Sequence, residues 1–214
     1  TTSTLQQEAA RKLGFTVSQT MMVAQHLYEN GRITYMRTDS VNLSSLCINA
    51  SKEKISELYG ANYSKVRQYH TSSKGAQEAH EAIRPTYMDQ TSIEGTVQEK
   101  RLYDLIWKRT AASQMADAEI EKTTVEISSE QTPSFIAQGE VIRFDGFLKV
   151  YRESSDDDDE GRDEQSHVLP PLTEGQELTR REILASERNT QGPQRYTEAS
   201  LVHKLEELGI GRPS

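Results

Sequence analysis

The apolar pattern of this chain changes near residue 116, and that change is the strongest constraint on its fold. Upstream, apolar residues recur at helical spacing, as they do in 97–115. Downstream, short alternating segments rich in β-branched and aromatic residues are separated by Gly, Pro and Asp-Gly. Helices followed by strands are typical of an α+β fold. We therefore predict a mainly α part followed by an antiparallel sheet.

The same patterns predict individual elements. Capping boxes at Thr4 and Thr16 mark the first two helices, and the third is expected to turn Leu46, Ala50, Ile55 and Leu58 inward. The expected helices are 4–13, 16–30, 43–59, 76–83, 97–115 and 197–207. The expected strands are 33–36, 123–127, 134–137, 141–144, 148–151 and 176–186. Two helices, a tight turn and the strand 33–36 outline a winged helix-turn-helix unit, a fold common among nucleic-acid binders.

Charge is concentrated in one segment. The 214 residues, enough for one or two domains, carry a net charge of −8, from 25 basic and 33 acidic residues. Residues 153–164 hold eight acids and one arginine, so they contribute −7 and leave about −1 for the rest. The remainder can therefore carry a basic groove for nucleic acid. The acidic run resembles a magnesium-binding motif, but low-complexity sequence does not hold carboxylates in place, so we predict no metal site.

Hydropathy, cysteine content and the chain ends give three further expectations. No apolar run approaches the roughly 20 residues that span a bilayer, so we expect a soluble, cytoplasmic protein with no membrane partner. Cys47 is the single cysteine, which excludes an internal disulfide, and we predict that it is a small buried side chain. The chain begins at Thr1 and stops just after a predicted helix end, so we expect an excised fragment.

The segment 33–40, ITYMRTDS, holds a pair of residues that suits phosphoryl chemistry. In an extended strand Tyr35 and Arg37 would point the same way. A phenol has an ordinary pKa of about 10, and a neighbouring guanidinium would favour the phenolate and stabilise a phosphoryl transition state. Attack on a phosphodiester would form a phosphotyrosyl ester of similar energy, so the cut would be reversible without ATP. Spacing alone instead favours a core tyrosine with an outward arginine, so the catalytic interpretation needs support from outside this motif.

ITYMRTDS resembles the active-site signature of the type IA DNA topoisomerases, within them the bacterial topoisomerase I group. Further matching segments follow in the expected order: TTSTLQQEA at the start, GAQEAHEAIRPT at 75–86, IRFDGF at 142–147 and YTEASLVHKLEELGIGRPS at the end. Together they cover most of the chain apart from loops and the acidic run.

The resemblance implies roles for individual residues. Tyr35 corresponds to the nucleophile that joins the 5′ phosphate of a cut single strand, and Arg37 to the arginine that steadies this phosphate. His80 corresponds to a histidine near the DNA backbone, with a helix-surface histidine as the alternative. Arg84 is a further DNA-binding candidate that would otherwise cap a helix C-terminus. The remaining DNA-binding candidates are Arg195, Ser200, Lys204 and Arg212, which without the family are an ordinary charged helix face.

The resemblance also implies an architecture. It divides the chain into a winged-helix-like tyrosine domain at 1–116, a β-sheet arch segment at 117–191 with an acidic loop at 152–166, and the start of a further helical domain at 192–214. The implied isomerase is a monomer that relaxes negatively supercoiled DNA without ATP. Its Mg²⁺ would be bound by a domain that precedes residue 1, so we expect this chain alone to be inactive. Junctions near Met115 and Gly192 are candidate hinges.

Two other interpretations remain open at this point. A non-catalytic winged-helix module would explain the first 36 residues, but it gives no reason for the Tyr35–Arg37 pair. A type IA enzyme of another subgroup, such as a decatenating or reverse-gyrase form, would share the same chemistry.

Trp107, on a predicted helix, is expected in the core and not stacked on a base.

Overall fold

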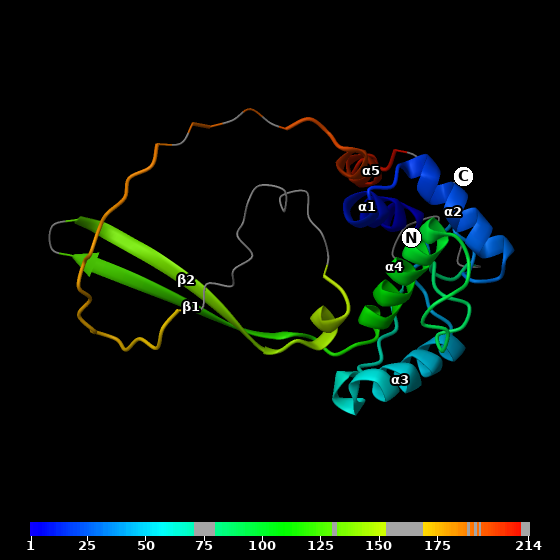
Figure 1. Cartoon of the computed structure of the whole chain (residues 1–214), viewed down its shortest axis with the longest axis horizontal. Helices are drawn as coiled ribbons and strands as arrows, with labels where there is room; N and C mark the ends of the chain where they lie inside the picture. Colours follow the sequence, from blue (N-terminus) through cyan, green and yellow to red (C-terminus); the bar gives the residue numbers. More distant parts are fainter. Residues whose placement is uncertain are drawn as a thin grey trace. The chain divides into compact units, whose positions relative to one another are not determined.

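The computed structural model describes residues 1–70, 80–129, 132–152, 169–187, 189–190, 192 and 194–210. Within them the elements are α1 (Thr2–Leu13), α2 (Val17–Glu29), α3 (Ser45–Tyr59), η1 (Ala61–Tyr63), α4 (Val97–Ser113), β1 (Glu119–Ser129), β2 (Thr132–Phe144), η2 (Gly146–Lys149) and α5 (Glu198–Glu207) (Figure 1). The α+β class is confirmed. No helix in this described part is long and apolar enough to cross a membrane.

The chain divides into two compact units. We call 1–118, 145–161 and 196–214 the helical unit, and 119–144 with 162–195 the hairpin unit. Within the helical unit α5 packs on α1, where Ser3 and Gln7 donate hydrogen bonds to Glu206 of α5 at 2.7 and 3.1 Å. The domain limits 1–116, 117–191 and 192–214 stay predictions, and the acidic run 153–164 lies outside the described residues.

Side-chain caps begin the helices of the helical unit, as the sequence suggests. Thr16 and Thr197 accept hydrogen bonds from the third residue of α2 and α5, and Thr96 forms a full capping box with Glu99. The prediction that Thr4 caps the first helix is wrong. Thr1 is the cap, because its side chain accepts from the backbone N–H of Thr4 and the helix begins two residues earlier.

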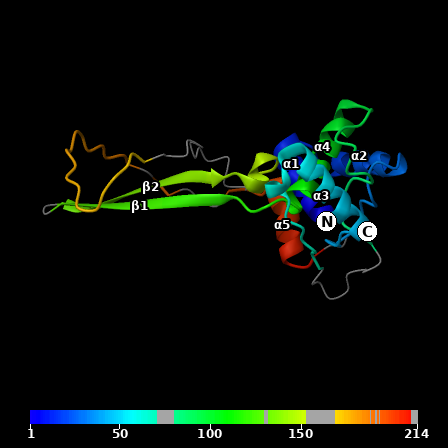
Figure 2. The same cartoon turned by 90° about the horizontal axis from the view of Figure 1, so that it is seen from below.

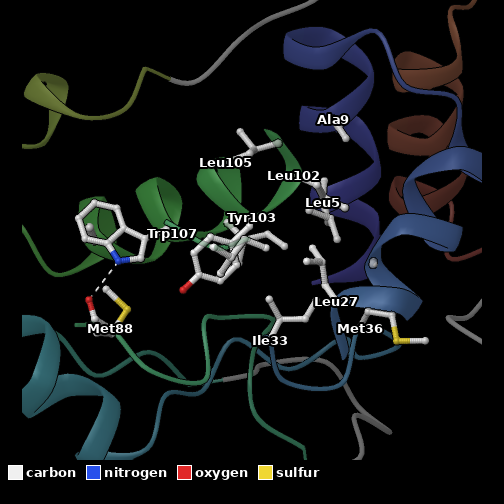
Figure 3. Close-up of a cluster of buried hydrophobic side chains, with 14 of the residues drawn as sticks. Leu5, Ala9, Leu27, Ile33, Met36, Met88, Leu102, Tyr103, Leu105 and Trp107 are labelled. Atoms are coloured by element: carbon white, nitrogen blue, oxygen red, sulfur yellow. Dashed lines mark hydrogen bonds between the residues drawn. The ribbon is translucent and has the colours of Figure 1, made fainter. Parts of the chain in front are cut away.

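The core of the helical unit lies between α1, α2 and α4 (Figure 3). Leu27, Met88 and Leu102 are at most 2% exposed. Trp107 is 4% exposed and its indole N–H donates to the Met88 carbonyl at 3.1 Å, which confirms its predicted core position. Tyr103 donates to the Gln90 carbonyl at 2.6 Å, and burial raises the pKa of its phenol to about 12. Both polar aromatic groups therefore enter the core with a partner.

The predicted buried face of α3 is partly wrong. Leu46 and Leu58 are 80% and 43% exposed, whereas Ile55 is buried as expected. The core instead receives Cys47 and Ser51, four residues apart on the face that leads to Ile55. The buried face of α3 therefore carries small side chains, and the hydrophobicity of its residues alone does not predict which face is buried. Cys47 is buried as predicted, and burial raises the pKa of its thiol.

In the hairpin unit, β1 and β2 pair antiparallel, with Lys122 opposite Glu140 and Val125 opposite Ala137 (Figure 2). The three strands predicted within 123–144 are confirmed, although two of them form one long strand, β2. A strand at 148–151 is wrong, because η2 and a turn occupy these residues. The predicted strand 176–186 is also wrong, because these residues form no strand and are exposed.

Within the helical unit, the residues just before and just after the hairpin are held by hydrogen bonds and close backbone packing. Tyr63 donates to Asp145 at 2.6 Å, and this hydrogen bond holds the pKa of the carboxyl below its ordinary value. Gly146 has φ +49°, and an added Cβ would lie 2.4 Å from the carbonyl oxygen of Asp117. Met115, a predicted hinge, is 0% exposed, and its neighbour Ala116 donates to the Tyr63 carbonyl at 2.8 Å.

Candidate active site

Tyr35 lies on the loop that follows α2. The predicted strand 33–36 is wrong: a single bridge joins Ile33 to Pro85, and bends follow. The bends still turn Ile33 and Met36 into the core (Figure 3), at 2% and 1% exposed. Tyr35, between them, is half-buried. Two core side chains thus anchor the loop on either side of a phenol that reaches the surface.

Residues 82–86 hold one flank of this loop. The backbone N–H of Thr34 donates to the Arg84 carbonyl, and that of Thr86 to the Arg32 carbonyl, each at 2.9 Å. The Thr34 hydroxyl donates to the Ala82 carbonyl at 2.7 Å and accepts from the Arg84 N–H at 3.0 Å. The residue next to Tyr35 is therefore bonded through both backbone and side chain.

Replacing Thr34 by Val keeps the shape of the side chain and removes both hydroxyl hydrogen bonds. We expect the free energy of unfolding to fall by about 1–3 kcal/mol, because the Arg84 N–H and the Ala82 carbonyl lose partners. Urea unfolding followed by circular dichroism measures the change. Thr34→Ser, which retains the hydroxyl, should recover most of the loss; equal loss in both variants would contradict this role.

The first residues of α1 hold the other flank. The buried Thr2 hydroxyl donates to the Met36 carbonyl at 2.8 Å and accepts from the Thr38 N–H at 2.9 Å. Thr38 in turn accepts from the Ser40 N–H at 3.0 Å, and both side chains are buried. The polar residues of the TDS motif therefore shape the loop from inside, while Tyr35 remains accessible.

Two aromatic rings contact the Tyr35 ring. His80, a predicted DNA-contacting residue, lies with its ring centroid 5.6 Å away at an interplanar angle of 37°. Tyr28, from the last turn of α2, lies 5.2 Å away in an edge-to-face arrangement at 68°. Sequence reasoning missed Tyr28, although an aromatic residue seven positions before the candidate nucleophile was a visible signal.

Arg37 is exposed two residues after Tyr35. Arg84 is less accessible than Arg37: its side chain is only 13% exposed and pairs with Glu81. Its guanidinium donates to Glu81 at 2.5 Å and to the Pro85 carbonyl at 2.9 Å. Arg84 therefore braces the segment that holds Thr34. Helix is absent from 80–83, and the rest of the predicted helix 76–83 lies outside the described residues.

The other predicted DNA contacts are far from Tyr35 in the sequence, although Ser200 and Lys204 belong to the same helical unit as Tyr35. Arg195 is exposed in the hairpin unit. Ser200 completes the cap of α5 by accepting from the Thr197 N–H at 2.8 Å. Lys204 forms a 2.7 Å ion pair with Glu207, which raises the pKa of the lysine. Arg212 lies outside the described residues.

A cavity of about 430 Å³ in the helical unit lies beside the residues that hold this loop, because Val41, Ala82 and Ile83 are among its lining residues. It is lined by α1, α4 and Tyr151, and Tyr35 is not among its residues. Tyr35 is thus half-buried and partly open to solvent, and it is not enclosed in this cavity. No group of three or more His, Cys, Asp or Glu in the described part of the chain is arranged to hold a metal ion, so these residues do not fit a magnesium site.

The whole chain, residues 1–214, matches the family model described as DNA topoisomerase. It is 50% identical over 219 residues to DNA topoisomerase 1 of Zymomonas mobilis, covering 100% of this chain and 18% of the relative. It is 51% identical over 221 residues to DNA topoisomerase 1 of Synechocystis, covering 100% of this chain and 24% of the relative. This chain therefore spans about a fifth to a quarter of these relatives.

A solved structure, full-length topoisomerase I from Thermotoga maritima, resembles this fold with a TM-score of 0.78 and 36% sequence identity. The match covers 99% of this chain and 35% of that one. The likeness thus extends over the loop of Tyr35 and over both units. The chain belongs to the DNA topoisomerase family.

Proposed function

We propose that this chain is the nucleophile-bearing part of a type IA DNA topoisomerase, which relaxes negatively supercoiled DNA through a transient single-strand break. The observation that carries the proposal is the presentation of Tyr35. Its half-buried phenol lies on a loop held from both flanks, contacts two rings, and precedes an exposed arginine. Relatives named DNA topoisomerase 1 support the assignment.

The proposed reaction balances without an energy source. The Tyr35 oxygen attacks the phosphorus of a single strand, a tyrosyl P–O bond forms, and the bond to the 3′ oxygen breaks. The phenolic proton leaves, and the departing 3′ oxygen takes up a proton and becomes a hydroxyl. The reverse attack by this hydroxyl restores the strand. Because one phosphodiester replaces another, no ATP is consumed.

The residues near Tyr35 contribute positive charge and help to position the DNA. Arg37 places a guanidinium near the phosphoryl oxygens, where negative charge develops in the transition state. We assign His80 to contact with the DNA backbone beside the phosphate, an assignment supported by its ring contact with Tyr35. Underwound DNA is the preferred substrate because it opens readily to single strands.

We assign the rest of the cycle to other parts of the protein. The hairpin β1–β2 belongs to an arch that moves when the cut ends separate, and 192–214 begins a further DNA-binding helical part. Mg²⁺ would be bound by carboxylates outside residues 1–214. The enzyme acts as a monomer in the bacterial cytoplasm, where its DNA is.

Trapping the covalent intermediate tests the proposal. The full-length protein that contains this chain is incubated with a labelled single-stranded oligonucleotide, denatured, and digested. We expect a nucleotide adduct on the peptide that contains Tyr35 and relaxation of supercoiled plasmid without ATP. Duplex binding with no adduct would instead favour a non-catalytic winged-helix module.

The isolated chain 1–214 should show neither cleavage nor relaxation in the same assays. It carries the nucleophile but no group assigned to protonate the departing 3′ oxygen. Mass spectrometry of the isolated chain after incubation with DNA checks this. An adduct on Tyr35 under those conditions would contradict the expected division of labour.

A further inference from the structure

We propose that Tyr28 is a positioning residue for Tyr35, an inference that rests on the proposed function. The ring of Tyr28 fixes the direction in which the phenolic oxygen of Tyr35 meets the scissile phosphate. Tyr28 acts through Tyr35 and takes no part in bond making.

The ring geometry supports this role. The two centroids are 5.2 Å apart with an interplanar angle of 68°, which is the favoured edge-to-face arrangement of aromatic pairs. His80 contacts the same ring at 5.6 Å and 37°. Tyr35 is thus contacted by two rings of different orientation, and a rotation about its χ1 angle, which would move the phenolic oxygen, would disrupt both contacts.

Tyr28 is itself held firmly. Its neighbour Leu27 is 1% exposed in the core, and the Tyr28 carbonyl accepts from the Gly31 N–H at 2.8 Å where α2 ends. Gln25 and Glu29 of the same turn are joined at 2.6 Å. The ring therefore projects from a rigid helix end onto a loop residue, an arrangement suited to orienting a reacting group.

The exposure of the Tyr28 side chain distinguishes a role in orienting Tyr35 from a role in packing the core. Tyr28 is 40% exposed, and it is not part of the buried core cluster of the helical unit. Its removal should therefore cost little stability. A residue that contributes little to folding but contacts the nucleophile is expected to affect the rate of reaction more than the folded population.

The test uses three variants of Tyr28 in the full-length protein, with Met22→Ala as matched control. Met22 lies on the same helix, is 56% exposed, and lies outside the ring cluster. Tyr28→Ala and Tyr28→Leu should lower the single-turnover cleavage rate of a single-stranded oligonucleotide about tenfold, with DNA affinity unchanged within about twofold. Tyr28→Phe, which retains the ring, and Met22→Ala should cleave at the unaltered rate. Thermal unfolding accompanies every measurement.

Each other outcome overturns the proposal. Cleavage by Tyr28→Leu at the unaltered rate would show that the ring is dispensable, and Leu retains apolar bulk if the Ala variant unfolds. A rate loss matched by an equal loss of DNA affinity would show that Tyr28 binds DNA instead. A defect in Tyr28→Phe would assign the effect to the hydroxyl. Tyr35→Phe, measured in parallel, is independent: cleavage by that variant would refute the proposed function itself.

Discussion

Replacing Tyr35 by Phe in the full-length protein is expected to abolish DNA cleavage and relaxation. Only the phenolic oxygen is lost, and the remaining ring keeps its contacts with Tyr28 and His80. Removing a catalytic nucleophile commonly costs at least about 10⁴-fold in rate. Plasmid relaxation and covalent adduct formation both measure the loss, and single-strand affinity should be retained.

Tyr28→Phe is the matched control for this variant. It removes the same oxygen atom from the adjacent ring, 5.2 Å away between centroids, and should leave cleavage intact. Plasmid relaxation by the Tyr35→Phe variant at an appreciable rate would refute the assignment of Tyr35 as the nucleophile. Loss of DNA affinity in Tyr35→Phe would mean that the hydroxyl contributes to binding as well as to chemistry.

Replacing Trp107 by Ala should have the largest effect on stability. The side chain is 4% exposed in the core of the helical unit, and such truncations cost about 3–5 kcal/mol in free energy of unfolding. It also removes the hydrogen bond to the Met88 carbonyl, close to the 82–86 segment that holds Thr34. Urea unfolding must be followed by circular dichroism, because Trp107 is the single tryptophan of the chain.

Trp107→Phe separates the two contributions. It keeps most of the apolar volume and loses the indole N–H, so we expect a smaller loss of about 1–3 kcal/mol from the unpaired carbonyl and the reduced volume. A loss below about 1 kcal/mol in Trp107→Ala would mean that the surrounding side chains collapse into the space.

The helix ends and the hairpin were predictable from local sequence. Thr16 and Thr197 cap the helices that follow them because the cap hydrogen bond spans three residues of one segment. Alternating apolar residues within 123–127 and 134–144 likewise produced β1 and β2. In each case the determining interactions are close in the sequence.

The wrong predictions share a cause. Leu46 is exposed while Cys47 and Ser51 are buried, because the neighbouring elements determine which face of α3 is covered. Residues 148–151 have strand-like composition, yet they form η2 and a turn where the chain leaves the hairpin, with Phe147 donating to the Ala116 carbonyl at 2.9 Å. Long-range contacts outweighed local preference in both places.

The sequence by itself determined the family and the identity of the candidate nucleophile, because ITYMRTDS is a contiguous motif. Only the tertiary structure decided how that tyrosine is presented. Thr2, Thr34 and the 82–86 segment hold its loop, and Tyr28 and His80 contact its ring. These partners come from separate parts of the chain, and folding is what brings them together. A motif specifies which atoms can react, whereas packing between distant segments specifies where those atoms point.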